Sequence, residues 1–245
     1  MPAKINIPKV AMVLGAGLGK RMRPITNTIP KPMVKVGGKA LIDWGLDSLV
    51  EAGVTRVVVN VHYLADKLEA HLQTRKDLGI AYSDEREALL ESGGGIVKAL
   101  PLLGSEPFYL VNSDTFWLDD KRSNLVAMAE YFDAAKMDIL LMLATAEQAT
   151  GHGAATDFLC GTDGKLARYK AGDASPFIYA GVAILHPRIF EGALDDAHSL
   201  NREFNVAIEN GRLFGLPMDG QWLTVGTPEA IAPAEAVVAA HRTRT

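Results

Sequence analysis

The residues with the clearest chemical purpose lie near the amino terminus, in a glycine-rich loop that also carries cations. Three glycines occur within residues 15–19, directly after the apolar run 10–14. Glycines let backbone N–H groups approach an anion closely. Arg21, and Lys31 between two prolines, add the positive charge that a polyphosphate needs. The loop therefore predicts a phosphate-binding site.

Two better-known phosphate-binding loops do not fit this stretch. The P-loop would require glycine at Leu14 and serine or threonine at Arg21. The dinucleotide-binding fingerprint accommodates Gly15 and Gly17, but its third glycine position is occupied by Lys20. What remains is a G-x-G-x-R pattern followed by a lysine in Pro-Lys-Pro. This combination favours a phosphate loop of a different class over a simple glycine turn.

A carboxylate follows the apolar run 108–111, in the sequence Asn112-Ser113-Asp114. A side chain at the carboxyl end of a buried parallel strand faces the crevice where such sheets bind ligands. Mg²⁺ takes one or two carboxylates together with phosphate oxygens and water, so Asp114 is a candidate magnesium ligand. An aspartate here could also cap a turn. The nearby phosphate loop is what favours the metal.

Two further motifs lie elsewhere in the chain. Residues 91–96, Glu-Ser-Gly-Gly-Gly-Ile, place three glycines before a predicted helix. Such a backbone surface could lie flat against a base, and the alternative is a flexible loop. Thr227 before Pro228 is typical of the start of a helix and needs no ligand to explain it.

Strands and helices alternate over the first part of the chain. We expect strands at 10–14, 57–61, 79–82, 108–111 and 139–144, and helices at 41–52, 64–72, 95–103 and 125–135. Regular β-α-β order predicts an α/β fold with a doubly wound, mostly parallel, Rossmann-like sheet. The glycine-rich loop and the segment 112–116 then fall at carboxyl ends of strands, where ligands of such sheets bind.

The pattern changes after Thr145, where a β-rich lobe is expected to extend the same sheet. Residues 156–160 and 166–169 flank Gly-Thr-Asp-Gly, which predicts a hairpin. Further elements are a strand at 177–185, a short apolar run at 213–216 and an alanine-rich helix from Pro228 to about Ala240. No linker interrupts the chain, so we expect one domain.

Composition narrows the class of protein. The chain has 245 residues, 48% of them hydrophobic, which suffices for one large α/β domain. The net charge of −4 does not favour nucleic acid, and the cations within 20–35 favour a small polyanion instead. The single cysteine, Cys160, excludes an intramolecular disulfide. No apolar run is long enough for a membrane span, and none follows Lys4 as in a signal peptide, so we expect a cytoplasmic protein.

Taken together, these motifs resemble those of the sugar-1-phosphate nucleotidyltransferase family. The G-x-G-x-R loop, Pro-Lys-Pro and the later motifs at 91–96, 111–114, 181–187 and 225–228 occur in the order of that family over nearly the whole chain. The motif Glu-Ser-Gly-Gly-Gly-Ile at 91–96 most resembles the corresponding motif of the bacterial N-acetylmuramate-1-phosphate uridylyltransferases of cell-wall recycling.

The resemblance implies a reaction and a set of roles. A nucleoside triphosphate, expected to be UTP, transfers its nucleotidyl group to a sugar 1-phosphate with Mg²⁺ as cofactor, and pyrophosphate leaves. Arg21 is expected to contact the triphosphate, Lys31 to bridge the α-phosphate and the sugar phosphate, and Asp114 to bind the metal. Nucleotide contacts are expected from Leu14, Gly15, Ala16, Gly17, Gly19, Glu91, Ser92, Gly93, Gly94 and Asn112, and sugar contacts from Gly153 and Gly181.

The same resemblance implies one domain over 1–245, with a nucleotide-binding part to about residue 145 and a sugar-binding part with a closing helix after it. One position departs from the family, because Thr224 stands where members usually have a second metal carboxylate. A hydroxyl is a poor Mg²⁺ ligand, and Asp43 or Asp219 could take its place.

Several alternatives stay open at this point. Guanylyl, thymidylyl or cytidylyl transfer to a hexose or heptose phosphate is compatible with the same motifs. Thr224 also leaves open a nucleotide-sugar-binding relative without turnover. Neither the oligomeric state nor the choice of base and sugar follows from these residues.

Overall fold

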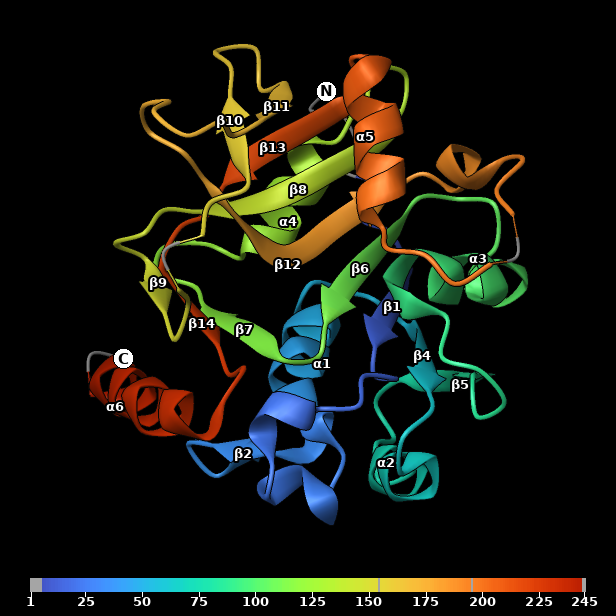
Figure 1. Cartoon of the computed structure of the whole chain (residues 1–245), viewed down its shortest axis with the longest axis vertical. Helices are drawn as coiled ribbons and strands as arrows, with labels where there is room; N and C mark the ends of the chain where they lie inside the picture. Colours follow the sequence, from blue (N-terminus) through green and yellow to red (C-terminus); the bar gives the residue numbers. More distant parts are fainter. Residues whose placement is uncertain (1–5, 154, 195, 244–245) are drawn as a thin grey trace.

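The computed structural model of this protein describes residues 6–153, 155–194 and 196–243. Its centre is a seven-stranded sheet. The strands lie side by side in the order β13-β8-β12-β6-β1-β4-β5 (Figure 1). Their bounds are β1 (Val10–Leu14), β4 (Arg56–Val61), β5 (Gly79–Asp84), β6 (Phe108–Asn112), β8 (Ile139–Ala144), β12 (Ile178–Leu185) and β13 (Leu213–Pro217).

Every strand of this sheet except β12 runs in the same direction. β1 pairs in parallel with β4 and β6, β4 with β5, and β8 with β13, whereas β12 is antiparallel to both of its neighbours. The predicted doubly wound, mostly parallel sheet is confirmed. The chain builds β1, β4 and β5 outward and then returns to place β6 on the other side of β1. At such a reversal of strand order, ligands bind outside the carboxyl ends of the strands.

Helices cover both faces because successive residues of each strand alternate between two apolar clusters. Met12 packs in the cluster beneath α3 and α5, whereas Val13 packs in the cluster beneath α1, α2 and α4. Figure 1 accordingly shows α5 in front of the sheet and α4 behind it. The helices are α1 (Leu41–Glu51), α2 (Ala65–Leu72), α3 (Glu91–Leu103), α4 (Asn124–Tyr131), α5 (Asn201–Glu209) and α6 (Ile231–Arg242).

A second, three-stranded sheet holds the segments that flank the ligand edge. It consists of β7 (Thr115–Leu118), β14 (Gln221–Thr224) and β9 (Ala149–Thr150). Together with α6 and the ribbon of β2 (Lys35–Val36) and β3 (Lys39–Ala40), it surrounds a third apolar cluster that includes Met22 and Leu223. Met22 is fully buried and directly follows Arg21, so this cluster anchors the glycine-rich loop.

Local patterns located most of the longer elements correctly and missed one helix and five short strands. The strands at 10–14 and 139–144 match β1 and β8, and the predicted hairpin is the antiparallel pair β10 (Phe158–Cys160) and β11 (Leu166–Arg168). The helix α5 and the strands β2, β3, β7, β9 and β14 were not predicted. β7 and β14 each have four residues and pair with each other across the chain, so their stability comes from a distant partner.

Two predicted helix boundaries are wrong by four residues, and a third helix, α6, begins at Ile231 and not at Pro228, after a 3-10 turn at Pro228–Ala230. α4 ends at Tyr131 and not at Ala135, because Phe132 is extended and the Asp133 carboxylate accepts the N–H of Ala135 in a turn. The other is the start of α3, discussed with the site. Within the described residues, no helix has both the length and the apolar composition to cross a membrane. The prediction of no signal peptide rests partly on residues 1–5, which lie outside the described residues.

Candidate active site

A cavity of about 420 Å³ lies at the carboxyl ends of β1 and β6, where the strand order reverses. Ten residues singled out from the sequence line it: Leu14, Ala16, Gly17, Gly19, Arg21, Lys31, Glu91, Ser92, Asn112 and Asp114. Six more complete the wall: Lys20, Pro32, Asn60, Leu89, Ser113 and Gly226. The glycine-rich loop and the Asn-Ser-Asp segment therefore face one space, as expected from their positions at neighbouring strand ends.

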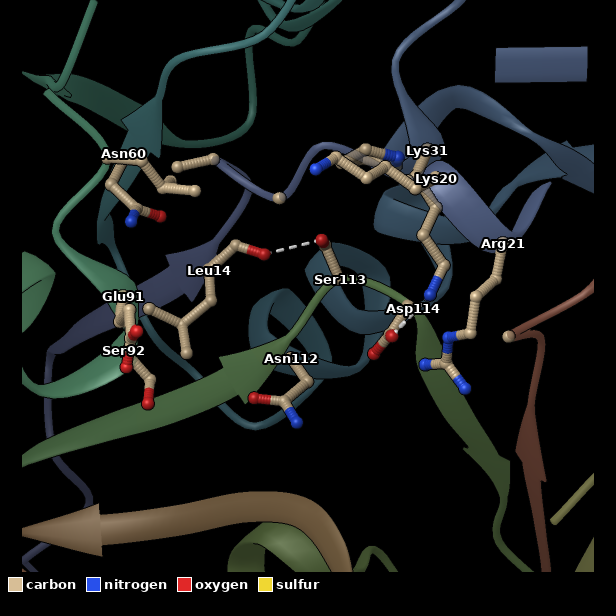
Figure 2. Close-up of a pocket in the computed structure, with 16 residues that line it drawn as sticks. Leu14, Lys20, Arg21, Lys31, Asn60, Glu91, Ser92, Asn112, Ser113 and Asp114 are labelled. Carbon is tan, nitrogen blue, oxygen red and sulfur yellow. Dashed lines mark hydrogen bonds and ion pairs between the residues drawn. The ribbon is translucent and has the colours of Figure 1, made fainter. Parts of the chain in front are cut away.

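The cavity has two chemically different ends. Figure 2 shows Arg21, Lys31 and Asp114 gathered at one end, and Asn60, Glu91 and Ser92 at the other. One end is rich in charge and suits a polyphosphate, while the other offers amide, hydroxyl and carboxylate groups that can bond to a polar ligand edge.

An ion pair dominates the charged end. The Lys31 ammonium lies 2.6 Å from the Asp114 carboxylate, and their side chains are 12% and 32% exposed. Lys31 comes from the Pro-Lys-Pro segment and Asp114 from the turn after β6, so two segments 83 residues apart meet here. The lysine is thereby held at the cavity wall, with its charge partly balanced until another ligand competes for it.

Arg21 differs from Lys31 because its charge has no partner in the part of the chain that the structure describes. Gly226 lies next to the guanidinium, because a Cβ built on it would be in van der Waals contact with the Arg21 Nη1 atom at 3.5 Å. A guanidinium presents several N–H donors in a planar fork that matches phosphate oxygens. Arg21 is thus available to an anion in the cavity.

One backbone conformation and two hydrogen bonds fix the shape of the glycine-rich loop. Gly19 has a φ of 59°, a left-handed conformation that glycine adopts easily, and its carbonyl accepts the Thr26 hydroxyl at 2.8 Å. The Ser113 hydroxyl donates to the Leu14 carbonyl and ties the ends of β1 and β6 together (Figure 2). The loop is therefore preorganised rather than folded around a ligand.

A buried polar network supports the other end of the cavity. Asn60 accepts the N–H of Gly15 at 2.8 Å and donates to the Glu85 carboxylate at 2.6 Å. The second Glu85 oxygen accepts the N–H of Leu90 at 3.1 Å, directly before Glu91 of the cavity wall. The network thus joins the glycine-rich loop to the start of α3.

This network was not predicted from the sequence, because its members lie in four separate segments. Asn60 and Glu85 are 3% and 0% exposed, so both polar side chains lie in the protein interior, where they bond to other buried groups. Asn60 does end a β-branched run at the carboxyl edge of the sheet, and that position was the one usable signal. Gly15 itself does not line the cavity, since a Cβ there would lie 2.9 Å from the Asn60 carbonyl oxygen.

The interpretation of the glycine triplet as a loop before a helix is wrong. α3 begins at Glu91 and includes all three glycines, and Gly93 and Gly94 both donate their N–H groups to the His198 carbonyl. A Cβ on Gly93 would lie 2.4 Å from the His198 ring, and one on Gly94 would lie 2.3 Å from the Asp196 carbonyl oxygen. The glycines therefore admit the 196–200 segment against the helix, while Glu91 and Ser92 face the cavity.

Gly93→Ala is expected to destabilise the fold. The added methyl overlaps the ring of His198, which is 5% exposed and held by the Glu203 carboxylate at 2.9 Å, so the ring cannot move freely. Overpacking of this kind costs about 1–3 kcal/mol, which a thermal melt would record as a lower Tm. Gly17→Ala is the matched control, because no atom lies within 4 Å of the added methyl. Equal melting temperatures for the two variants would contradict this packing role.

A second cavity of about 160 Å³ adjoins the first and shares Leu14, Ser92 and Asn112 with it. Neither Gly153 nor Gly181, the residues expected to shape a sugar site, lines either cavity. Gly153 is exposed. Gly181, on β12, packs against Asn112 and Thr115. Gly181 thus supports a wall residue rather than forming the wall itself.

The acidic residues near the site fit a metal that is shared with a ligand. No group of three histidine, cysteine or acidic side chains that could hold a metal occurs among the described residues. Mg²⁺ commonly takes one or two protein carboxylates and fills its shell with phosphate oxygens and water. The partly exposed Asp114 at the charged end meets that requirement.

The two alternative acids do not reach Asp114. Asp43 bonds to His71 at 2.9 Å on the α1–α2 side, and Asp219 accepts the N–H of Lys121 at the opposite end of β14. Thr224, in contrast, pairs with Thr115 in the ladder of β14 and β7, and the next residue, Val225, donates to the Asp114 carbonyl. Position 224 therefore lies beside Asp114, although Thr224 offers no carboxylate.

Comparisons with known proteins agree with this geometry. Residues 10–240 match the model of the nucleotidyl transferase family. The chain is 45% identical to N-acetylmuramate alpha-1-phosphate uridylyltransferase of Caulobacter vibrioides, over 95% of this chain and 98% of that one. It is 34% identical to the protein of the same name from Neisseria meningitidis, over 95% and 99% of the two chains.

Solved structures with low sequence identity share the fold. The inositol-1-phosphate CTP transferase of T. maritima superposes with a TM-score of 0.78 at 17% identity, over 97% of each chain. A UDP-glucose pyrophosphorylase complexed with UDP-glucose gives a TM-score of 0.74 at 18% identity, over 97% of this chain and 99% of that one. By the match over 10–240 and the identity to its relatives, this chain belongs to the nucleotidyl transferase family.

Proposed function

We propose that this protein transfers the uridylyl group of UTP to N-acetylmuramate 1-phosphate and releases pyrophosphate. The observation that carries the proposal is the cavity at the carboxyl ends of β1 and β6, with Arg21, Lys31 and Asp114 at one end and polar groups at the other. The choice of UTP and of the muramate sugar rests on relatives that carry this name at 45% and 34% identity.

In this reaction an oxygen of the sugar phosphate attacks the α-phosphorus of UTP, and the bond from that phosphorus to the bridging oxygen of pyrophosphate breaks. The protein supplies position and charge rather than a covalent intermediate. Lys31 holds the α-phosphate and the incoming phosphate together, and Arg21 stabilises the leaving pyrophosphate. Both cations face the negative charge that moves during the step.

The remaining wall residues orient the nucleotide. Gly17 and Gly19 let the triphosphate approach the loop backbone, Ala16 lines the same cavity, and Leu14 and Asn112 lie between the phosphate end and the base end (Figure 2). Glu91 and Ser92 contact the base edge. Gly15, Gly93 and Gly94 act indirectly, because they pack the loop and the start of α3 rather than line the cavity.

Asp114 would hold Mg²⁺ in this reaction. When bound, the ion supplies positive charge that neutralises phosphate oxygens. Because Asp114 is a single carboxylate, the free protein binds the metal weakly and the nucleotide completes the ligand set. A triphosphate donor places the reaction in the cytoplasm, where the product would return muramate to cell-wall synthesis.

A matrix of triphosphates against sugar 1-phosphates, with pyrophosphate release as the readout, tests the proposal. UTP with N-acetylmuramate 1-phosphate is expected to give the highest kcat/KM. Preference for another triphosphate would move the assignment to a guanylyl, thymidylyl or cytidylyl transferase. Thr224 favours one further candidate, a binding protein without turnover, and this candidate predicts nucleotide binding but no pyrophosphate at any Mg²⁺ concentration.

Thr224→Asp is expected to lower the Mg²⁺ concentration that gives half-maximal turnover. The position lies beside Asp114 in the β14–β7 ladder, so the new carboxylate adds a second hard oxygen ligand at the charged end. It also repels phosphate, and metal-free UTP should therefore bind more weakly. Thr224→Asn is the matched control, because asparagine has the shape of aspartate without its charge. An unchanged Mg²⁺ dependence in Thr224→Asp would show that position 224 does not face the metal.

A further inference from the structure

An arginine, Arg168, lines the second cavity but not the first. Arg168 lies at the end of β11 and lines this cavity together with Asp157, Phe158 and Tyr179. The cavity adjoins the first one through Ser92 and Asn112. A group bound here would therefore sit next to the nucleotide.

The guanidinium of Arg168 is held rigidly by neutral partners. Its Nε atom donates to the Asn205 side-chain oxygen at 3.0 Å, and its Nη2 atom donates to the Asn201 side-chain oxygen at 2.9 Å. Its central carbon lies 4.8 Å from the ring centre of Phe158. Amides and an aromatic face orient a cation without neutralising it.

No carboxylate of a described residue forms an ion pair with Arg168, and its Nη1 group makes no hydrogen bond to one. Burial lowers the pKa of the guanidinium, an effect that the charge of Asp157 partly offsets. A partly buried, oriented and unpaired cation beside a cavity is suited to bind an anion.

The neighbours of Arg168 favour a ligand that also carries hydroxyl or amide groups. The Tyr179 hydroxyl is buried and has no hydrogen-bond partner among the described residues. The Asp157 carboxylate accepts the N–H of Tyr179 at 2.9 Å and would repel an anion placed beside it. An acidic group must therefore lie on the Arg168 side, with neutral polar groups toward Asp157 and Tyr179.

We infer that Arg168 binds the carboxylate of an acidic sugar phosphate and so sets the sugar specificity of this enzyme. The inference rests on the proposed function, in which the acceptor is N-acetylmuramate 1-phosphate. That sugar differs from N-acetylglucosamine by a lactyl ether on its third oxygen, which adds one carboxylate. A guanidinium fork fits a carboxylate closely, whereas N-acetylglucosamine 1-phosphate would leave Arg168 partly buried and unpaired.

The first test uses the wild-type protein with UTP and three acceptors. These are N-acetylmuramate 1-phosphate, its neutral lactamide, and N-acetylglucosamine 1-phosphate. The lactamide keeps the size of the muramate sugar and removes only its charge. We expect kcat/KM for the muramate acceptor to exceed that for both others by roughly 10- to 100-fold, the value of a charge-assisted hydrogen bond.

The second test removes the cation. Arg168→Met should lower kcat/KM for the muramate acceptor to the level of the lactamide, and should leave the KM for UTP and the rate with N-acetylglucosamine 1-phosphate nearly unchanged. Arg168→Lys keeps the charge but not the fork, so it should restore part of the preference. Arg202→Met is the matched control, because Arg202 lies on α5, the helix whose asparagines hold Arg168, but pairs with Asp196 outside the cavity.

The outcomes separate this inference from the proposed function. If the wild type does not use the muramate acceptor with any triphosphate, the proposed function is wrong. If it uses the muramate acceptor and the lactamide equally well, or if Arg168→Met keeps the preference for the acid, the function stands and the role of Arg168 is overturned. The lactamide comparison decides the question even if Arg168→Met fails to fold.

Discussion

Lys31→Ala is expected to lower kcat about 10²–10³-fold, the usual effect of removing one preorganised group that stabilises transition-state charge. The ammonium is 12% exposed and fixed 2.6 Å from Asp114, so it already occupies its position before substrate arrives. During transfer, negative charge builds on the phosphate oxygens between sugar and nucleotide. Alanine leaves this charge uncompensated.

The same substitution also changes binding. Without Lys31, the Asp114 carboxylate stands unpaired at the charged end of the cavity and repels the triphosphate. The KM for UTP should therefore rise together with the fall in kcat, and steady-state kinetics would measure both. Because Lys31 lies at a cavity wall and not in the core, the Tm should change little.

Lys39→Ala provides the matched control. Lys39 forms an ion pair with Asp47 at the same distance of 2.6 Å, and neither residue lines the cavity. Exposed pairs of this kind contribute little to stability, so this variant should keep the wild-type kinetics. Wild-type rates in Lys31→Ala as well would refute the assignment of the charged end.

Asp114→Asn is expected to lower turnover to a similar extent while strengthening metal-free nucleotide binding. The amide removes the carboxylate that we propose as the Mg²⁺ ligand, so activity should fall at every Mg²⁺ concentration. It also releases Lys31 from its ion pair and removes a negative charge beside the phosphates. Calorimetric titration with UTP in the presence of a chelator should therefore give a lower Kd than the wild type.

These opposite effects distinguish a metal ligand from a structural acid. A residue that only positioned Lys31 would weaken nucleotide binding and catalysis together when replaced. Asp47→Asn, in the exposed pair with Lys39, controls for loss of a surface charge. In the double variant with Lys31→Ala, the losses in kcat should not add, because the two groups act on the same phosphate charge. Additive losses would show that the two residues act separately.

Local sequence determined the elements and the chemistry at their ends. β1 and β6 are short apolar runs, and their length together with the glycine or polar residues that follow them identifies them as buried strands. The β-α-β order then fixes a parallel sheet, and with it the edge where Arg21, Lys31 and Asp114 had to lie. These inferences succeed because each depends on residues close together in the chain.

The tertiary structure decided what depends on contacts between distant segments. Gly93 and Gly94 of α3 make room for the 196–200 segment, and Gly95 makes room for the Glu85 carboxylate, which Asn60 and Leu90 hold by hydrogen bonds. Neither partner can be identified from the local pattern. The same holds for β7 and β14, which are too short to be recognised without each other.

The residue that we propose to set the sugar specificity is also positioned by contacts between distant segments. Arg168 appears in the sequence as one cation in a hairpin, and only the packing of α5 against β11 supplies the asparagines that hold it. The nearness of Thr224 to Asp114, and the distance of Asp43 and Asp219 from it, likewise follow from strand pairing and not from spacing. The local order of strands and helices determines which groups lie at the ligand edge, because it determines the direction of each strand. Long-range pairing sets which of them meet, because it determines the neighbours of each side chain.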